Sequence, residues 1–352
     1  MDKNIETRKR ITIYDIAKEA GTSTATVSRV LSNSGYPVKE ELRKKILDTA
    51  EKLNYSPNAL GRMLKKSESR DIGVIIPTIS NPFYPQVVLG IELEARRRGY
   101  GILLCNSFRD PETEKKYITS LVQKQVKGII ISSIDANHIS LKEIIGNDVK
   151  VVAFDQNIKG LKCSKVGFDF VKGGMLAVEY LIKKGHRNIA FATSPLTRKS
   201  RLETLEGYKL ALLKHGLPFN ERNIIASSSE EEYENVNYEF ENGRKLAASF
   251  LQLEERPTAI FAVNDMTAFG VIRELWNNGV NIPNDVSVVG FDNIEISSMI
   301  NPPLTTINQP SFETGKLACK TLLDLMEDKG SQEVSITLEP SLVERKSVKE
   351  LV

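Results

Sequence analysis

The apolar positions of residues 12–31 form two short stripes with a helical period. The first stripe follows Thr12, a residue type that favours the N-cap of a helix, and consists of Ile13, Ile16, Ala17 and Ala20. The second consists of Val27, Val30 and Leu31. Between them, Gly21 tolerates the left-handed conformation that ends a helix, and Thr22 or Ser23 is suited to cap the next one. The pattern predicts two helices that pack against each other across a tight turn.

The outward face of the second predicted helix carries small polar side chains and one long cation. At about 100° per residue, this face contains Thr24, Ala25, Ser28, Arg29 and Ser32. Small side chains allow a helix to enter the major groove of DNA closely, and an arginine can donate two hydrogen bonds to guanine. The same pattern also fits an ordinary helical hairpin inside a larger core, so these residues alone leave both interpretations open.

Residues 36–66 extend the pattern with a third helix and a short cationic one. The apolar stripe of the third helix consists of Leu42, Ile46, Ala50 and Leu53, and three short helices can close a small core. Pro57 then precedes NALGRMLKK, residues 58–66, in which three cations surround Met63 and Leu64. A cationic helix of two turns has no core of its own.

The segments TIYDIAKEAGTSTATVSRVL (residues 12–31) and NYSPNALGRML (residues 54–64) resemble the helix-turn-helix and the hinge helix of the LacI/GalR family of transcriptional repressors. The resemblance implies a DNA-binding domain at residues 1–57, a hinge helix and linker at residues 58–70, and a leucine wedge that enters the minor groove of a pseudo-palindromic operator. The DNA-binding residues that it implies are Tyr14, Ser23, Thr24, Ala25, Thr26, Ser28, Arg29, Asn58, Arg62 and Leu64.

Two positions of this region depart from the family pattern. Ser32 stands where the family usually has asparagine, at the end of the recognition helix. Gly61 replaces the more usual alanine of the hinge helix, and glycine lowers helix propensity by up to about 1 kcal/mol. We therefore expect the hinge to be disordered in the absence of DNA.

From residue 71 the pattern changes to short apolar runs that alternate with amphipathic helices. Runs rich in valine and isoleucine lie at residues 72–77, 100–106, 127–133 and 150–156, and again at 187–193, 257–264 and 285–292. Parallel strands that are buried on both faces have this composition. Helical periodicity marks the segments between them, including residues 171–184, 203–215, 241–252 and 266–278. We therefore predict two doubly wound α/β lobes with parallel sheets.

The family resemblance implies that these lobes form an effector-binding and dimerisation core, residues 71–352, similar to periplasmic sugar-binding proteins. Three stretches of such a core cross between the lobes, and we place them near residues 165–169, 291–293 and 329–336. The first lobe then comprises about residues 71–165 and 294–328, and the second comprises about residues 166–293 and 329–352.

Residues at the ends of the predicted strands are candidates for a small-molecule site, because ligands of open α/β sheets bind beyond the carboxyl ends of the strands. By resemblance, aromatic rings of the loop SNPFYPQ stack on the effector, and carboxylates accept hydrogen bonds from its hydroxyl groups. The candidate effector-binding residues are Asn81, Phe83, Tyr84, Asp155, Arg201, Tyr238, Asp265 and Asp292.

Several of these candidates have a structural interpretation as well. The rings of Phe83 and Tyr84 can pack within their own lobe, and either Asp155 or Asp265 can cap a helix. Tyr238 resembles an aromatic lid but also fits a surface position.

Asp292 and one departure from the family complete the predicted site. Asp292 lies at a predicted crossing, where its carboxylate can reach a ligand or brace the hinge. Thr204 stands where an effector-binding arginine is common. The cations just upstream, Arg198, Lys199 and Arg201, are candidates to supply that charge, which would suit an acidic sugar or another carboxylate.

Charge is distributed unevenly along the chain. Residues 1–70 hold 15 of the 48 Lys and Arg residues but only 9 of the 45 Asp and Glu residues. The remaining residues therefore carry a small excess of acidic groups, although the whole chain has a formal net charge of +3. The cationic end is the one that we expect to bind a polyanion.

Motifs for catalysis and cofactor binding are absent from the sequence. It contains no phosphate-binding or dinucleotide-binding glycine motif after a strand, no G-x-S-x-G elbow, and no metal-ligand spacing among its 3 histidines. Its 3 cysteines are an odd number and widely spaced, as expected of reduced core residues. No run of about 18 apolar residues or signal-peptide pattern occurs. We predict a cytoplasmic, non-enzymatic protein without a cofactor.

Together these features predict a sequence-specific DNA-binding repressor of a carbohydrate or related catabolic operon. We expect a homodimer or tetramer that is switched by a sugar, sugar acid or sugar phosphate between the lobes. The alternatives are a regulator switched by a partner protein, a solute-binding receptor without a DNA role, and a sugar-processing enzyme on the same scaffold. The helix-turn-helix and the lack of a signal-peptide pattern argue against the receptor.

Overall fold

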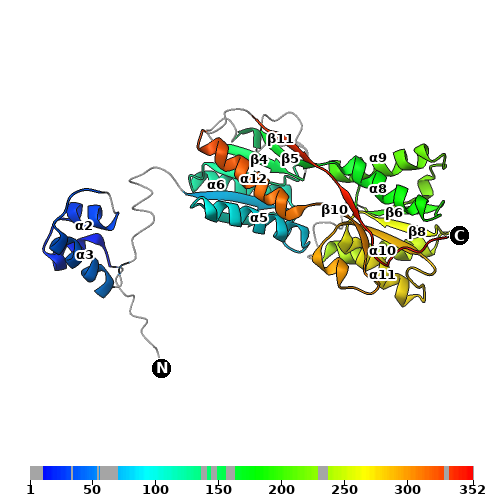
Figure 1. Cartoon of the computed structure of the whole chain (residues 1–352), viewed down its shortest axis with the longest axis horizontal. Helices are drawn as coiled ribbons and strands as arrows, with labels where there is room; N and C mark the ends of the chain where they lie inside the picture. Colours follow the sequence, from blue (N-terminus) through cyan, green and yellow to red (C-terminus); the bar gives the residue numbers. More distant parts are fainter. Residues whose placement is uncertain are drawn as a thin grey trace, which may run out of the picture. The chain divides into compact units, whose positions relative to one another are not determined.

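The computed structural model describes residues 11–32, 35–53, 55, 70–135, 141–143, 149–155, 163–228, 237–328 and 333–351. The chain divides into two compact units, Met1–Glu68 and Ser69–Val352 (Figure 1). The predicted hinge helix, with Asn58, Arg62 and Leu64, lies outside the described residues.

The first unit contains three packed helices: α1 (Ile13–Ala20), α2 (Thr24–Leu31) and α3 (Glu40–Lys52). One isoleucine or valine from each helix is fully buried at the centre, namely Ile16, Val27 and Ile46. The smaller side chains of the predicted stripes, including Ala20 and Val30, complete this core. The prediction of helices that pack across a tight turn is therefore confirmed.

Residues at the ends of α1 and α2 determine where these helices begin and end. The carboxylate of Asp15 accepts a hydrogen bond from the backbone N–H of Thr12 at 2.8 Å, at the start of α1. Gly21 has φ +68° and ends that helix. The hydroxyl oxygen of Ser23 accepts a hydrogen bond from the backbone N–H of Thr26 at 3.2 Å, so Ser23, not Thr22, is the N-cap of α2.

The second unit consists of two lobes, and each is built on a six-stranded sheet (Figure 1). The strands of the first sheet are β1 (Asp71–Ile76), β2 (Gly101–Asn106), β3 (Gly128–Ile131), β4 (Lys150–Phe154), β5 (Ser164–Phe168) and β11 (Ser335–Leu338). Those of the second are β6 (Ile189–Thr193), β7 (Ile224–Ala226), β8 (Ala259–Ala262), β9 (Ser287–Asp292), β10 (Thr305–Asn308) and β12 (Ser341–Val343).

The strand orders are β11-β5-β4-β3-β1-β2 in the first sheet and β12-β10-β9-β8-β6-β7 in the second. All neighbouring pairs are parallel except β10 and β12. Both sheets therefore have the doubly wound, mostly parallel arrangement that the apolar runs predicted.

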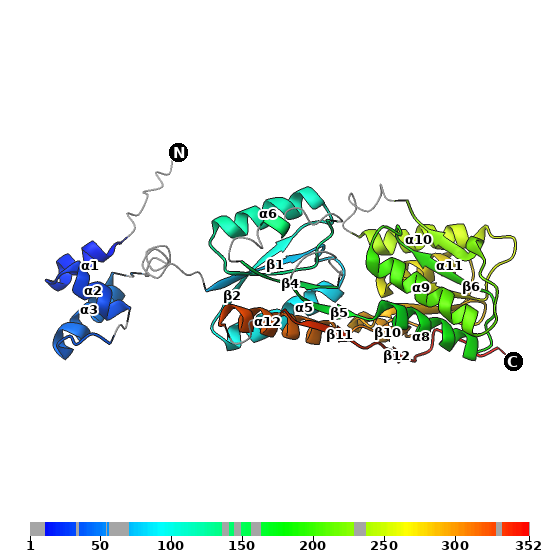
Figure 2. The ribbon, with the colours of Figure 1, turned by 90° about the horizontal axis from the view of Figure 1, so that it is seen from above.

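Helices cover both faces of each sheet (Figure 2). In the first lobe, α5 (Phe83–Arg97) and α12 (Ser311–Met326) lie on one face and α6 (Pro111–Gln123) lies on the other. In the second, α8 (Phe170–Lys183) and α9 (Lys199–Lys214) lie opposite α10 (Tyr238–Leu251) and α11 (Asp265–Asn277). Two short 3-10 helices, η1 (Glu221–Asn223) and η3 (Glu295–Ser298), complete this lobe.

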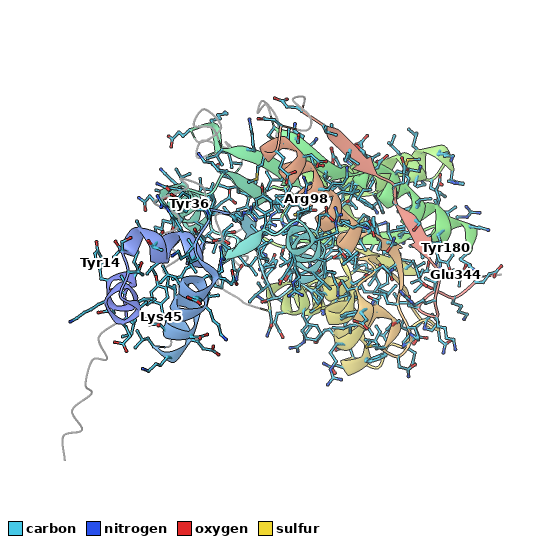
Figure 3. All side chains as sticks on the ribbon, turned by 60° about the vertical axis from the view of Figure 1, so that its left-hand side comes forward. Tyr14, Tyr36, Lys45, Arg98, Tyr180 and Glu344 are labelled. Atoms are coloured by element: carbon cyan, nitrogen blue, oxygen red, sulfur yellow. The ribbon has the colours of Figure 1, made fainter. Side chains whose placement is uncertain are left out.

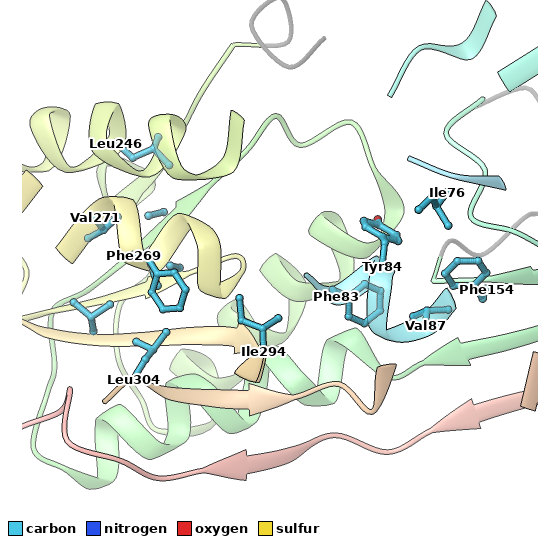
Figure 4. Close-up of a cluster of buried hydrophobic side chains, with 14 of the residues drawn as sticks. Ile76, Phe83, Tyr84, Val87, Phe154, Leu246, Phe269, Val271, Ile294 and Leu304 are labelled. Atoms are coloured by element: carbon cyan, nitrogen blue, oxygen red, sulfur yellow. The ribbon is translucent and has the colours of Figure 1, made fainter. Parts of the chain in front are cut away.

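Side chains of β1 alternate between the two faces of their sheet. Ile72, Val74 and Ile76 join the core beneath α5 and α12, whereas Ile75 joins the core beneath α6. The first of these cores continues into the second lobe, where it includes Phe269 and Leu304 (Figure 4).

Paired helices in each lobe approach each other through glycines. A Cβ atom on Gly207 of α9 would lie 2.0 Å from the backbone oxygen of Val171 in α8. A Cβ atom on Gly315 of α12 would lie 1.9 Å from the backbone oxygen of Val87 in α5. Only glycine permits such an approach, which in the second lobe places the first turn of α8 against the middle of α9.

Two of the three predicted crossings between the lobes were wrong. One crossing lies at residue 169, between β5 and α8. Because β10 pairs with β9 in the second sheet, the next crossing lies at residues 309–310 and not at 291–293. The third lies at residues 339–340, between β11 and β12, and not at 329–336.

The lobe boundaries change accordingly: residues 294–308 belong to the second lobe and residues 333–338 to the first. The sequence of β10, TTIN, lacks the apolar run that marked the other strands. Thr305 and Thr306 are nevertheless fully buried, because their hydroxyl groups bond to the backbone N–H of Arg345 and to the carboxylate of Asp265.

Candidate functional site

The predicted DNA-reading residues of the first unit lie on its surface. Val27 and Val30 point into the core, so the opposite face of α2 is left accessible. Tyr14 of α1 is 74% exposed (Figure 3). None of the predicted residues in the described part of this unit is buried: Tyr14, Ser23, Thr24, Ala25, Thr26, Ser28 and Arg29.

Three of these residues also make contacts within the unit. The hydroxyl groups of Ser23 and Thr26 are 2.9 Å apart and hydrogen-bonded, which adds to the N-cap of α2. The guanidinium carbon of Arg29 lies 4.0 Å from the centroid of the Tyr36 ring. The accessible face of α2 is therefore short, polar and cationic, which matches what a recognition helix needs to enter the major groove.

A cavity lies between the two lobes of the second unit, at the carboxyl ends of the strands. Six of the eight predicted effector-binding residues line it: Asn81, Phe83, Tyr84, Asp155, Arg201 and Asp292. The other lining residues are Arg109, Phe170, Arg198, Ser200, Thr204, Glu239, Val263, Asn264, Phe291 and Gln309. This mixture of aromatic rings and polar groups is typical of small-molecule sites.

The first lobe contributes an aromatic pair and a carboxylate to the cavity. The rings of Phe83 and Tyr84 meet edge to face with centroids 5.2 Å apart, at the start of α5 (Figure 4). The carboxylate of Asp155 accepts hydrogen bonds from the hydroxyl groups of Tyr84 at 3.1 Å and Ser132 at 3.3 Å. Burial, and next the charge of Asp155, raise the pKa of Tyr84 well above its usual value, so this hydroxyl remains a donor.

An ion pair joins the two lobes at the cavity. Arg109 follows β2, and Glu239 lies in the first turn of α10. The guanidinium and carboxylate groups are in contact, and these side chains are only 4% and 9% exposed. Arg109 also lies 5.7 Å from the ring centroid of Tyr238. The sequence alone does not reveal this pair, because no local pattern connects residues that are 130 positions apart.

Asp292, at the end of β9, faces an unusually acidic environment. Burial raises the pKa of Asp292 well above its usual value, and the charges of Asp265 and Asp155 raise it further. A hydrogen bond with Asn81 lowers it. Because a hydrogen-bond donor stabilises an ionised carboxylate, this part of the cavity favours a ligand that carries hydroxyl groups.

Asp265 does not line the cavity, so its prediction as an effector-binding residue is wrong in this arrangement. Its carboxylate is fully buried and accepts hydrogen bonds from the backbone N–H of Ile294 at 3.0 Å and from the hydroxyl groups of Ser297 at 2.6 Å and Thr306 at 2.5 Å. Burial raises the pKa of Asp265 to about 6 despite these bonds. The preceding residue, Asn264, lines the cavity instead.

Tyr238 is the second predicted residue outside the cavity lining. Only 3% of its surface is exposed, and its hydroxyl group lies 2.9 Å from that of Ser227. Tyr238 is therefore neither a surface tyrosine nor, in this arrangement, a ring open to the cavity. Its ring, in the first turn of α10, lies 5.7 Å from the guanidinium carbon of Arg109.

The cations upstream of Thr204 separate into two groups. Arg198 and Arg201 line the cavity, and Arg201 also donates a hydrogen bond to the backbone oxygen of Pro195 at 2.9 Å. Lys199 does not line it and instead pairs with Glu203 at 2.9 Å. Two arginines at the start of α9 thus line the cavity near Thr204, the position where the family commonly has an arginine.

Neither a metal site nor a membrane span is found within the described residues. No three His, Cys, Asp or Glu side chains converge there in a way that would hold a metal ion. None of the described helices has the length and apolar character needed to cross a bilayer.

Comparison with known proteins agrees with both units. The model of bacterial regulatory proteins of the lacI family matches residues 12–58, and that of the periplasmic binding protein-like domain matches residues 178–348. The chain is 35% identical over 342 residues to the HTH-type transcriptional repressor PurR of Vibrio atlanticus (strain LGP32), with 97% of this chain and 99% of that protein covered. The chain belongs to the LacI family. It is a helix-turn-helix transcriptional regulator.

Solved structures of other LacI-family regulators share this fold. The lac repressor dimer bound to operator and the anti-inducer ONPF superposes with a TM-score of 0.82 at 28% identity, covering 97% of this chain and 100% of that one. A LacI family regulator from Enterococcus faecium with bound ribose gives a TM-score of 0.71 at 29% identity, covering 80% of this chain and 100% of that one. The similarity to the lac repressor therefore covers nearly the full length of both chains.

Proposed function

We propose that this regulator is a repressor of a carbohydrate or related catabolic operon, which binds a pseudo-palindromic operator and is switched by a small metabolite in the cavity. The observation that carries the proposal is the convergence of six predicted effector residues from both lobes on one cavity. In the same chain, the polar face of α2, the proposed recognition helix, is accessible on the first unit. The protein acts as a sensor and not as an enzyme.

DNA recognition is assigned to α2 and the hinge segment. Thr24, Ala25 and Arg29 read base edges in the major groove, since they occupy the accessible face of the helix. The remaining predicted contacts, to the backbone and neighbouring bases, are made by Tyr14, Ser23, Thr26 and Ser28. The hinge residues Asn58 and Arg62 bind beside Leu64, which enters the minor groove and bends the operator.

A second copy of the chain is the proposed partner of an apolar surface on the first lobe. Leu89 and Leu93 of α5 and Leu104 of the edge strand β2 are each 46–47% exposed. Large apolar side chains on a helix and an open sheet edge favour association. The lac repressor, with the same fold, is described as a dimer. A dimer presents two recognition helices to two half-sites, so the operator is symmetric.

The effector proposed is a sugar, and the two arginines favour one with an acidic group. Asp155 and Asp292 supply acceptors for hydroxyl groups, and the Phe83 ring offers an apolar surface for a sugar face. Arg198 and Arg201 bring positive charge to the start of α9, where the helix dipole also favours an anion. A ribose-bound relative supports the sugar class. A sugar acid or sugar phosphate would use all of these groups.

The switch proposed is a change in the relation between the lobes. The buried Arg109–Glu239 pair connects them, so it favours the arrangement in which the cavity is closed. A ligand shifts the equilibrium only if it binds one arrangement more tightly than the other. The same difference in affinity then changes the affinity of the regulator for DNA.

Binding selection followed by calorimetry tests this function. The purified full chain is used to select duplexes from a random library, and sugars, sugar acids and sugar phosphates are then screened for binding. We expect an enriched pseudo-palindrome and a ligand that changes its affinity. Arg201→Ala should weaken binding of that ligand at least tenfold if it is acidic, because hydrogen bonds to charged groups contribute about 1.5–3 kcal/mol.

Lys199→Ala is the matched control, since Lys199 is on the same helical turn but pairs with Glu203 outside the cavity. It should bind the ligand as the wild type does. Equal ligand affinities of wild type and Arg201→Ala would reject the role of Arg201, and a library without any enriched symmetric sequence would reject the regulator itself.

A further inference from the structure

Arg29, the only arginine on the accessible face of α2, stacks on an aromatic ring. Its guanidinium carbon lies 4.0 Å from the ring centroid of Tyr36, well within the distance of about 6 Å at which a cation is attracted to a ring face. Arg29 belongs to the last turn of α2, and Tyr36 follows Gly35, whose φ of +68° turns the chain. The contact therefore joins the recognition helix to the segment that follows it.

Tyr36 is not explained by the packing of the first unit. Half of its surface is exposed (50%), and it is not among the residues of the unit's apolar core. Val38 and Tyr55, which lie later in the same unit, do pack against that core. Tyr36 is labelled on the first unit in Figure 3. Its position beside Arg29, a proposed base-reading residue, suggests a role other than packing.

Stacking and base reading use different parts of the arginine side chain. The ring contacts the flat face of the guanidinium group, whereas guanine is bound by N–H groups at its edge. One guanidinium group can therefore engage both. An arginine that is already held in place also loses less rotamer freedom when DNA binds. This smaller entropic cost favours the matched base, to which the guanidinium group is bound, over a mismatched one.

We propose that Tyr36 is a positioning residue for Arg29, and that its ring orients the guanidinium group for base recognition before the operator binds. The inference rests on the proposed DNA-reading role of α2. Removal of the ring should lower discrimination between matched and mismatched half-sites about two- to fivefold per half-site, the range expected of an exposed cation–π contact.

A double-mutant cycle on the full chain tests this role. The probe is the symmetric duplex that the wild-type protein selects from a random library, together with the same duplex in which the base pair read by Arg29 is replaced in both half-sites. Tyr36→Leu removes the ring and keeps apolar bulk, whereas Tyr36→Phe keeps the ring and removes the hydroxyl group. The ratio of the two affinities is measured for each variant, alone and combined with Arg29→Ala.

We expect Tyr36→Leu to lower the ratio, Tyr36→Phe to retain it, and Tyr36→Leu to have no further effect once Arg29 is alanine. An equal effect of Tyr36→Leu with and without Arg29 would overturn the inference, because the ring would then act on DNA or on the fold directly. Loss of the ratio in Tyr36→Phe would also overturn it, because the hydroxyl group would then be responsible.

The outcomes for the inference and for the proposed function can be told apart. If Arg29→Ala lowers the ratio and Tyr36→Leu does not, α2 reads DNA and Tyr36 does not position its arginine. If the wild-type protein selects no symmetric duplex, the proposed function fails, and the inference fails with it. Circular dichroism of each variant verifies that the helices are retained.

Discussion

The proposed DNA-reading face of α2 and the cavity between the lobes differ in how far apart their residues lie in the sequence. Apart from Tyr14, the described residues of the first fall within positions 23–29 of one helix. Those of the second come from positions 81 to 309, on both lobes. Helical periodicity alone arranges the first set, whereas two sheets and three crossings bring the second set together. Local sequence pattern is therefore sufficient to predict the first site but not the second.

Removal of one charge from the ion pair between the lobes should have the largest effect and tests how strongly the cavity depends on long-range contacts. Arg109→Met leaves the buried carboxylate of Glu239 without its partner, and loss of one partner from a buried pair costs about 3–5 kcal/mol. We expect the free energy of unfolding of the core to fall by at least about 3 kcal/mol in urea titrations.

The matched control is Arg96→Met, which removes an exposed cation of α5 that lies 3.7 Å from Glu92. Exposed pairs of this kind contribute less than about 1 kcal/mol. If both substitutions lowered the free energy of unfolding equally, the ion pair at the cavity would have no special role in joining the lobes.

Asp265 provides a pH-dependent test of the buried network behind the cavity. Its pKa is about 6 in the folded chain, above the usual value of 3.8. The folded state therefore holds the proton more tightly than the unfolded state does. As the pH rises from about 4 to 6, Asp265 ionises in the unfolded state but stays protonated in the folded state, so the free energy of unfolding falls. The loss is complete above that range.

Asp265→Asn removes this titration and serves as the reference. Between pH 4 and 7, the free energy of unfolding of the wild type should fall relative to the variant by up to about 3 kcal/mol, at about 1.4 kcal/mol for each unit of pKa shift. Denaturant titrations across this range measure the difference. A difference that is constant with pH would mean that Asp265 does not carry the raised pKa.

Arg29→Ala tests the proposed DNA-reading face of α2, whose residues lie close together in the sequence. Loss of a bidentate contact to guanine should cost about 1–3 kcal/mol of discrimination in each half-site. Competition binding with the selected operator and a scrambled duplex measures it. The control Lys44→Ala removes an exposed cation of α3 and should weaken binding to both duplexes equally. If Arg29→Ala kept the wild-type ratio of affinities for the two duplexes, this prediction would be contradicted.

Substitution of the N-cap of α2 should have the smallest effect. Ser23→Ala removes the oxygen that accepts a hydrogen bond from the backbone N–H of Thr26, and such caps contribute about 1 kcal/mol. Amide hydrogen exchange of α2 should become faster by about fivefold, whereas Thr22→Ala should leave it unchanged. If Thr22→Ala had the larger effect, the cap would be assigned to the wrong residue of the turn.

The sequence was most informative where apolar residues form uninterrupted runs. SVVGFD was recognised as the buried strand β9, but its neighbour TTIN was not, because its threonines are buried through hydrogen bonds to partners far along the chain. The misplaced crossing had a consequence for the site. Gln309, which lines the cavity, lies at the crossing that the prediction placed elsewhere.

Side-chain direction was the other limit of prediction. The motif VNDMTAFG indicated a polar residue at the end of β8, but Asn264 lines the cavity while Asp265 is buried behind it. Adjacent residues at a strand-to-helix junction point in different directions, and a single sequence does not say which one faces a ligand. For Arg109 and Glu239, only the tertiary fold brings the two charges together.

Control of a DNA-reading surface by a metabolite in the cavity is the central claim, and crossed titrations of the full chain test it most directly. Affinity for the selected operator is measured with and without the ligand found by calorimetry, for wild type, Arg29→Ala and Arg201→Ala. We predict that Arg29→Ala loses operator discrimination and keeps ligand affinity, whereas Arg201→Ala binds the operator normally and needs more ligand to respond. A saturating ligand that leaves the operator affinity of the wild type unchanged would contradict the claim.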